Sequence, residues 1–325
     1  MATPLMNRSS YPYQFDKEIA KMFYGKYADY PKEFDKLAKI ETFPKGRTYT
    51  EAEISPLGGL RAMGEGEAIS YDMPVEGHKK SIQTVKFGLG FQKTEEMGDD
   101  ELFGMSNKMS SSLSRAASVC ADTNFWNLFN NGFSGTTCWD GQPVFGTHTT
   151  LKSAQSIANY ASGDLSQTTL EAAFEYYDNL VDEAGIKLLL KPNLLVIPSK
   201  LKWAANDLLK STGRVWDFTA KASGLVSGTV GSSAVAGGPV NGLLNGTNPS
   251  NGIVDAWSIF VSRYLTDDDS WFLLSDQHDF RFYWKKRPTM SSSDDFDTDN
   301  KLYKVVMRFA VGVFDWRGGY GGLGA

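Results

Sequence analysis

The chain has 325 residues, of which 41% are hydrophobic and 22% are charged, so it can bury the core of one large domain or of two to three smaller ones. Its formal net charge of -5 argues against a dedicated nucleic-acid-binding protein, because such proteins usually carry a basic excess. Two cysteines are too few for a disulfide framework and favour reduced thiols in a cytosolic product. No run of about 20 apolar residues predicts a membrane span, and the start of the chain lacks the apolar core of a signal peptide.

The first 45 residues form an aromatic-rich segment with helical spacing. Its apolar side chains recur every three or four positions, at Phe15, Ile19, Met22, Phe23, Tyr27, Tyr30, Phe34 and Leu37. We expect Pro31 to divide the stretch into two helices. Because so few residues cannot close a core alone, residues 1–45 are interpreted as an arm that packs on something else.

Residues 46–92 change to the alternating pattern of strands. One strand is predicted over 68–75 and a second over 81–91, and each places its apolar side chains on one face. The alternating apolar residues are Ile69, Tyr71, Met73 and Val75 in the first, and Val85, Phe87, Leu89 and Phe91 in the second. The segment therefore predicts a long, hairpin-like excursion. Glycines between positions 58 and 66 mark a mobile section, and the pattern leaves open which glycine cluster forms its tip.

Residues 94–130 return to a helical period. The apolar stripe consists of Leu102, Met105, Met109, Leu113, Ala116 and Cys120, and Phe125 and Leu128 prolong it. A helix of about 32 residues would be about 48 Å long, which exceeds the usual helix of a globular protein. We expect such a rod to lie across a sheet or to span a subunit. Four serines at 110–114 weaken its propensity, so packing has to stabilise it.

A helix is predicted over 168–185. Thr168 and Glu171 have the spacing of a capping box, and Gly185 is a plausible end of the helix. The apolar side chains Leu170, Phe174, Tyr177 and Val181 share one face.

A buried strand and a second helix complete this block. The apolar run 188–197 contains Pro192 and is closed by Pro198. Ser199 then caps a helix that continues to Leu208. The order helix, strand, helix predicts a small α/β core.

The last third of the chain begins with a loop and ends in strands. Residues 221–252 are rich in Gly, Ser and Asn and are interpreted as a long surface loop. Short strands follow at 253–262, 270–274 and 279–284, and a long strand is predicted over 303–313. The aromatic and basic stretch 280–288 could contact nucleic acid, but its alternation favours a strand with one buried face.

No reactive constellation is found in the sequence. Its three histidines lie in separate segments, and neither a G-x-S-x-G elbow nor a Walker phosphate loop is present. Asp295, Asp297 and Asp299 alternate as in a calcium loop, but Asn300 and Val306 stand where that loop needs glycine and glutamate. A solvated acidic turn is therefore favoured there. The arm, the excursion and the rod helix leave apolar surface that needs partners, so the sequence predicts a subunit of an assembly.

The order of these segments resembles the major capsid proteins of tailed phages, which have the Hong Kong phage capsid fold. The motifs that carry the resemblance are "DGQPVFGTHTT", "GIKLLLKPNLLVIPSKLKWAANDLLKS", "SWFLLSD" and "FDTDNKLYKVVMRFAVGVFDWRG", within residues 10–318. The resemblance implies an α+β fold divided into four parts. These are an N-terminal arm (1–45), an extended two-stranded loop (46–93), a peripheral domain with the spine helix (94–165 and 300–325) and an axial domain (166–299).

The resemblance also implies the function. The chain would be a head shell protein, not an enzyme, that forms pentamers and hexamers and self-assembles into an icosahedral shell around double-stranded DNA. Its partners would be its own copies, a separate scaffolding protein, portal and decoration proteins, and packaged DNA held non-specifically. No cofactor, metal or membrane is implied. The protein would be made in the host bacterial cytoplasm and end in the virion.

Contacts between subunits would come from the arm and the extended loop. The residues predicted to make them are Phe15, Phe23, Tyr27, Tyr71, Met73, Phe87 and Phe91. Some relatives crosslink a lysine of this loop to a neighbour, but no motif selects among Lys79, Lys80 and Lys86. The alternatives are an encapsulin-like nanocompartment shell of the same fold, a β-rich phage tail or spike protein that binds through tryptophan-rich strands, and, third, an enzyme.

Overall fold

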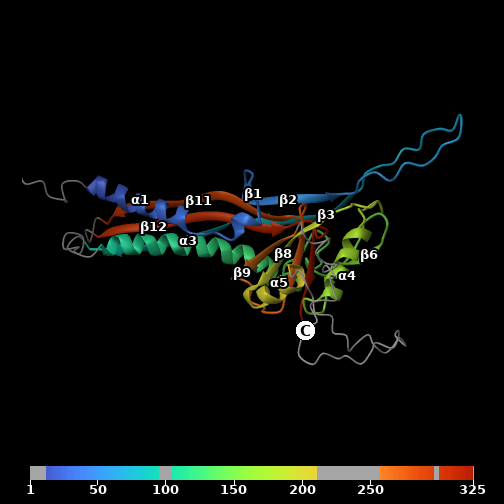
Figure 1. The fold of residues 1–325 in the computed structure, drawn as a ribbon. Helices are drawn as coiled ribbons and strands as arrows, with labels where there is room; N and C mark the ends of the chain where they lie inside the picture. Colours follow the sequence, from blue (N-terminus) through green and yellow to red (C-terminus); the bar gives the residue numbers. More distant parts are fainter. Residues whose placement is uncertain (1–11, 95–103, 211–256, 296–299, 325) are drawn as a thin grey trace, which may run out of the picture.

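The structure is a computed structural model that describes residues 12–94, 104–210, 257–295 and 300–324. The molecule is elongated, with two helices and two long strands running side by side along one half (Figure 1). These are α1 (Pro12–Asp29), α3 (Met105–Asn130), β11 (Phe280–Asp294) and β12 (Lys301–Val313). The predicted glycine-rich loop, 221–252, lies outside the described residues.

A four-stranded sheet forms the long half, in the order β1-β11-β12-β4. β1 (Lys39–Thr42) is parallel to β11, while β11, β12 and β4 (Val85–Lys93) are antiparallel. The long strand predicted near the end of the chain is therefore confirmed. Its alternate residues Tyr303, Val305, Met307 and Phe309 are buried on the face that packs on α3.

The predicted spine helix is confirmed as α3, which begins at Met105. Four serines at i, i+4 spacing lie on its buried face: Ser106, Ser110, Ser114 and Ser118. Such small side chains let α1 approach closely, and the Ser110 hydroxyl donates a hydrogen bond of 3.0 Å to the Ile19 carbonyl. Two of the serines that weaken helix propensity, Ser110 and Ser114, thus lie on the face whose packing stabilises α3.

The arm differs from its prediction in two ways. It contains one helix, α1, followed after Pro31 by only a short 3-10 turn, η2 (Phe34–Lys36). The arm also packs on its own chain, because α1 contacts α3 and β11 and Phe23 is fully buried. The Asp122 carboxylate of α3 fixes the turn by accepting backbone hydrogen bonds of 2.9 Å from Glu33 and Phe34.

A five-stranded sheet forms the compact half, in the order β7-β13-β10-β8-β9. Its strands are β7 (Tyr160–Ala161), β8 (Pro192–Pro198), β9 (Ser258–Ser262), β10 (Trp271–Ser275) and β13 (Gly319–Gly322). The predicted buried strand is β8, in which Leu195, Val196 and Ile197 have no exposed surface. Pro192 begins this strand and does not interrupt it, because residues 188–191 lie outside the ladder.

The strand β13 is absent from the sequence prediction. It is built from the glycine-rich tail and pairs with both β10 and β7. A Cβ atom on Gly322 would lie 2.0 Å from Nε1 of Trp271, so only glycine fits beside that indole ring. The glycines that conceal the strand in the sequence are thus required by its packing.

The helices of the compact half are α4 (Gln167–Asn179) and α5 (Lys202–Lys210), with a 3-10 turn η3 (Ser199–Leu201) before α5. The capping box predicted at Thr168 and Glu171 is wrong. Ser166 is the N-cap of α4, and its side chain exchanges hydrogen bonds with Thr169. Gly185 lies beyond the end of α4 in a separate turn with φ of 87°. Ser199, predicted as a cap, lies inside η3.

The strands of the extended loop and their pairing differ from the prediction. β2 (Thr48–Ile54) pairs with β3 (Glu76–Gln83), and residues 55–75 between them form no strand. The strand predicted over 68–75 is therefore wrong, and β4 pairs with β12 and not within the hairpin. Figure 1 shows this loop reaching away from the body, where it has no sheet to join. A short antiparallel pair, β5 (Thr147–Thr149) and β6 (Ser156–Ala158), lies in the compact half.

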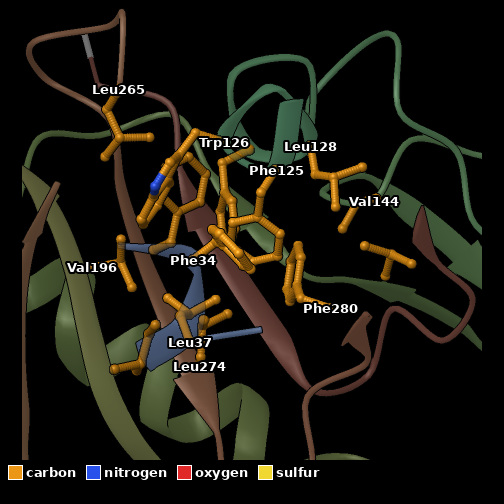
Figure 2. Close-up of a cluster of buried hydrophobic side chains, with 14 of the residues drawn as sticks. Phe34, Leu37, Phe125, Trp126, Leu128, Val144, Val196, Leu265, Leu274 and Phe280 are labelled. Carbon is orange, nitrogen blue, oxygen red and sulfur yellow. The ribbon is translucent and has the colours of Figure 1, made fainter. Parts of the chain in front are cut away.

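The main hydrophobic core lies where the arm, α3 and both sheets meet (Figure 2). Phe34 of the arm stacks on Phe282 of β11, with 4.4 Å between ring centroids. Phe129 of α3 stacks on Phe280 of β11 at 4.3 Å and also contacts Phe272 of β10 at 5.2 Å. One continuous core therefore joins the two sheets.

Candidate assembly surface

The extended loop exposes a group of large apolar side chains. Tyr71 is 92% exposed, Met73 76% and Leu60 106%, so they gain almost no burial from their own chain. The complete set is Ile54, Leu57, Leu60, Met63, Ile69, Tyr71, Met73 and Val75. Single exposed apolar residues are common on protein surfaces, but a contiguous group is typical of an interaction site.

A few polar contacts define the shape of this loop. The Asp72 carboxylate accepts a hydrogen bond of 2.7 Å from the Gly58 N–H on the opposite leg, and it contacts Lys152 Nζ at 2.5 Å. These hydrogen bonds lower the pKa of Asp72. Near the tip, Arg61 pairs with Glu67 at 2.5 Å. Asp72 thus joins the two legs and connects them to the body of the chain.

A buried ionic cluster anchors the base of the loop. Arg317, near the end of the chain, pairs with Glu183 and lies 3.0 Å from Asp315 and 4.0 Å from Glu53 of β2. Glu53 in turn contacts His78 of β3 at 3.2 Å. The side chains of Arg317, Glu183 and Glu53 are each at least 92% buried. The cluster ties the hairpin to the compact half.

A second set of contacts holds the hairpin to the four-stranded sheet. Lys80 donates hydrogen bonds to the carbonyls of Thr137 and Val313, the latter at 2.7 Å, and burial lowers the pKa of its amine. Glu51 of β2 pairs with Arg281 of β11 at 3.0 Å. The base of the loop is therefore rigidly placed, while its tip is left without packing.

The predicted contact residues fall into two groups. Tyr71 and Met73 are exposed on the loop. The other described ones have partners within the chain: Tyr27 stacks on buried Phe23, while Phe87 stacks on Phe309 at 4.7 Å and Phe91 on Tyr303 at 5.1 Å. The side chain of Phe15 lies outside the described residues.

These placements show which of the predicted residues are still accessible to another subunit. Phe23 has no surface left for a neighbour, so its predicted role is replaced by one in the core. Sequence reasoning missed Leu57, Leu60 and Met63, although apolar residues within a glycine-rich stretch were a usable signal. Contacts of Tyr71 and Met73 with another subunit stay a prediction, because the structure holds one chain.

The three histidines of the described residues have different surroundings. His78 contacts Glu53, His148 contacts Asp140 at 2.7 Å, and burial lowers the pKa of His278 to about 4. No group of three or more His, Cys, Asp or Glu side chains in this part of the chain is placed to hold a metal ion. None of its helices combines the length and apolar character needed to cross a bilayer.

The fold is shared with solved phage capsids. The mature capsid of bacteriophage PhiM1 superposes with a TM-score of 0.57 at 10% identity, covering 90% of this chain and 87% of that one. The capsid of an empty GTA particle gives 0.56 at 11% identity, with coverages of 90% and 89%. The capsid of bacteriophage JBD30, decorated with minor capsid protein trimers, gives 0.51 at 13%, with coverages of 73% and 92%. These likenesses identify the fold as the Hong Kong phage capsid fold.

The sequence itself points to the same family. None of the curated proteins matches the chain. The family described as phage capsid protein matches residues 79–321, about three quarters of the chain. The matched range includes β4, the spine helix, most of both sheets, and Arg317 with its partners Glu183 and Asp315, whereas β1 and Glu53 precede it. The chain therefore belongs to the phage capsid protein family and is a major capsid shell protein, a component of the virion.

Proposed function

We propose that copies of this protein form the pentamers and hexamers of an icosahedral shell that encloses double-stranded DNA, and that the protein acts structurally and not as an enzyme. The observation that carries the proposal is the exposed apolar loop on a rigid base. Burying such a surface against identical neighbours stabilises association, and closure of the shell multiplies contacts that are weak individually.

In this proposal each part of the chain has a place in the shell. The five-stranded sheet with β8 forms the axial domain around five- and sixfold axes, and the four-stranded sheet with α3 forms the peripheral domain. Because β11 pairs with β12, and β13 with β10, the proposed domains follow the sheets and not the boundaries at residues 166 and 300. The extended loop lies on a neighbouring subunit, with Tyr71 and Met73 at the contact.

The remaining partners are part of the same proposal. A separate scaffolding protein, a portal and decoration proteins complete the particle, and packaged DNA is held without specific recognition. The JBD30 capsid is decorated with minor capsid protein trimers, which supports a decoration partner for this fold. Synthesis takes place in the host bacterial cytoplasm.

The test is assembly of the purified chain, followed by electron microscopy and light scattering. Wild-type protein should form isometric shells or capsomer rings. The double variant Tyr71→Ser/Met73→Ser should remain as monomers or isolated rings at the same concentration, because two exposed apolar contacts are lost. Ser70→Ala, at an exposed polar position of the same loop, is the matched control and should assemble normally.

The contents of particles formed in cells test the DNA part of the proposal. Nuclease-protected double-stranded DNA is expected when the other particle proteins are supplied. A shell that encloses a cargo enzyme and no DNA would replace the proposal with a nanocompartment. Persistent monomers of the wild-type chain at high concentration would contradict self-assembly, and tight trimers alone would favour a tail or spike protein.

A further inference from the structure

A cleft lies between the spine helix α3 and the two strands that it contacts, β4 and β12. Its volume is about 240 Å³. Val305 and Met307 of β12 are buried at its inner end, and Phe87 of β4 forms part of one wall. Leu89 also lines the cleft but is 58% exposed, so it stands at the mouth. The cleft is therefore closed towards the core of the chain and open towards solvent.

Small side chains on α3 leave this space. The helix lines the cleft with Leu113 and then with Ala116, Ala117 and Cys120, at steps of three and four residues, so its side chains become smaller within one turn. The facing strand β4 is paired with β12 along its whole length, from Val85 to Lys93, and cannot move towards the helix without breaking that pairing. The sequence of α3 thus creates the space, and the pairing of the sheet maintains it.

The lining of the cleft is apolar. Among the described residues that line it, none carries a charge, and the sulfur atoms of Cys120 and Met307 are the only heteroatoms of their side chains. Sγ of Cys120 already accepts a hydrogen bond of 3.6 Å from Nδ2 of Asn124. A buried water molecule needs several polar partners, which these side chains do not supply. An apolar ligand therefore displaces only weakly held water from the cleft.

The volume sets the size of such a ligand. An apolar cavity of about 150 Å³ in another protein stays dry and binds benzene, whereas pockets for drug-sized molecules begin at about 300 Å³. The cleft lies between these two values. It accommodates a benzene ring with a short alkyl group, which is roughly ten non-hydrogen atoms. The open mouth lets a small polar group at the other end of the molecule remain in water.

We propose that this cleft is a binding site for a compact, neutral apolar molecule of alkylbenzene size. The ligand packs on Val305 and Met307 and fills the gap between α3 and β4, so it stabilises the folded subunit by mass action. A molecule with a charge at its buried end is excluded, because the lining offers that charge no partner. The site lies within one chain, so the inference goes beyond the proposed function and does not depend on the formation of shells.

Binding of 4-isopropylbenzyl alcohol to the purified full chain tests the site. In protein labelled with ¹³C in the methionine methyl groups, the Met307 signal, assigned by its loss in Met307→Leu, should shift on titration. The signal of Met63, on the extended loop, should not shift. The matched compound 4-carboxybenzyl alcohol has a carboxylate in place of the isopropyl group and should bind at least tenfold more weakly. Only the first compound should raise the unfolding temperature of the subunit.

The two cysteines provide a second measurement that needs no substitution. The ligand should slow the alkylation of Cys120 by iodoacetamide at least fivefold, because this thiol lies in the wall of the cleft. Cys138 is buried elsewhere and should stay unmodified with and without the ligand. Mass spectrometry of the two cysteine peptides measures both rates. An unchanged rate at Cys120 in the presence of saturating ligand would overturn the proposal.

Filling the cleft locates the binding. Ala116→Leu should abolish the Met307 shift and the protection of Cys120, and it should raise the unfolding temperature because it fills a cavity. Thr123→Leu, at an exposed position of the same helix outside the cleft, is the matched control and should bind the ligand as the wild type does. An equal Met307 shift in Ala116→Leu, or none in the wild type, would contradict the site.

The assembled particle distinguishes the ligand from a neighbouring copy. If Cys120 in shells is alkylated at the rate of the free subunit and the ligand slows it, the cleft is a small-molecule site in both states. Protection of Cys120 in shells without any ligand would assign the cleft to a side chain of a neighbouring copy and overturn the proposal. Should Ala116→Leu not fold, the alkylation of wild-type Cys120 decides alone.

Discussion

Arg317 illustrates how single residues hold the base of the extended loop. Its guanidinium is surrounded by the carboxylates of Glu183, Asp315 and Glu53, and its side chain is only 7% exposed. A buried ion pair adds little net stability compared with an apolar pair, because both charges lose their hydration. Removing one partner is a different matter, since the remaining charges stay buried without compensation. The main consequence of losing Arg317 is therefore that the carboxylates of Glu183 and Glu53 stay buried without a cation, and not the loss of its own favourable contacts.

Arg317→Ala should lower the free energy of unfolding by about 3–5 kcal/mol, because Glu183 and Glu53 lose their buried cation. Urea unfolding of the unassembled subunit, followed by circular dichroism, measures the change. Lys200→Ala removes an exposed pair with Asp269 and is the control, for which no measurable change is expected. An Arg317→Ala midpoint equal to that of the wild type would show that water or another cation replaces the guanidinium.

Asp122 makes the attachment of the arm depend on pH. Burial raises the pKa of its carboxyl from 3.8 to about 6, although two backbone N–H groups oppose the shift. The folded state therefore binds this proton more tightly than the unfolded state. The free energy of unfolding that it contributes is largest below pH 3.8 and falls as the pH rises towards 6.

Asp122→Asn keeps an oxygen that can accept the two N–H bonds but has no charge. At pH 7.5 the variant should be more stable than the wild type by about 1–2 kcal/mol, less than the full equivalent of the pKa shift. The difference should shrink as the pH approaches 4. Parallel urea titrations at several pH values measure it, with Asp268→Asn in an exposed turn as the control. Equal destabilisation at every pH would mean that the ionised carboxylate is the better cap.

At the scale of elements, the start of α4 distinguishes two capping assignments. Ser166 exchanges hydrogen bonds with Thr169, while Thr168 is exposed and its side chain has no hydrogen bond within the described chain. Ser166→Ala should therefore cost about 1 kcal/mol of stability, and Thr168→Ala should be close to neutral. Thermal unfolding of the two variants side by side makes the comparison. A larger loss from Thr168→Ala would restore the capping box at Thr168 and Glu171.

Strong periodicity made several elements predictable. β12 and α3 each bury one face against a large core, so their apolar residues recur with a clear period. The alternation at 68–75 looked the same but belongs to exposed residues with no sheet beside them. β13 was hidden because glycine carries no apolar pattern, and its place depends on Trp271.

The candidate site was predictable only in part. Tyr71 and Met73 were recognised because apolar residues in a glycine-rich excursion need a partner. The ionic cluster of Arg317, Glu183 and Glu53 could not be recognised, because these residues lie far apart in the chain and become neighbours only in the folded structure. A pattern within one segment is visible in a sequence, whereas contacts between distant segments depend on the fold.

At the scale of the whole molecule, stability and assembly are assigned to different parts. The continuous core between the two sheets stabilises the subunit by itself, and the extended loop adds little to it, because residues 56–75 contain no buried side chain. The loop can therefore change its contacts without unfolding the body. Its apolar surface is available for the free energy of association, and the ionic cluster at Arg317 keeps its base in place.

This separation predicts the hydrogen exchange of the free and the assembled protein. The backbone N–H groups of residues 59–63 and 68–71 have no hydrogen-bond partner in the described chain, so in the free subunit they should exchange nearly as fast as in an unstructured peptide. Assembly should slow them at least tenfold, because docking on a neighbour excludes water from the loop. Amides of β12 should be protected in both states and serve as the internal control. Mass spectrometry of peptides from both forms measures the change. Protection of the loop already in the free subunit would mean that it folds back on its own body, and unchanged exchange in the shell would mean that it remains in solvent there.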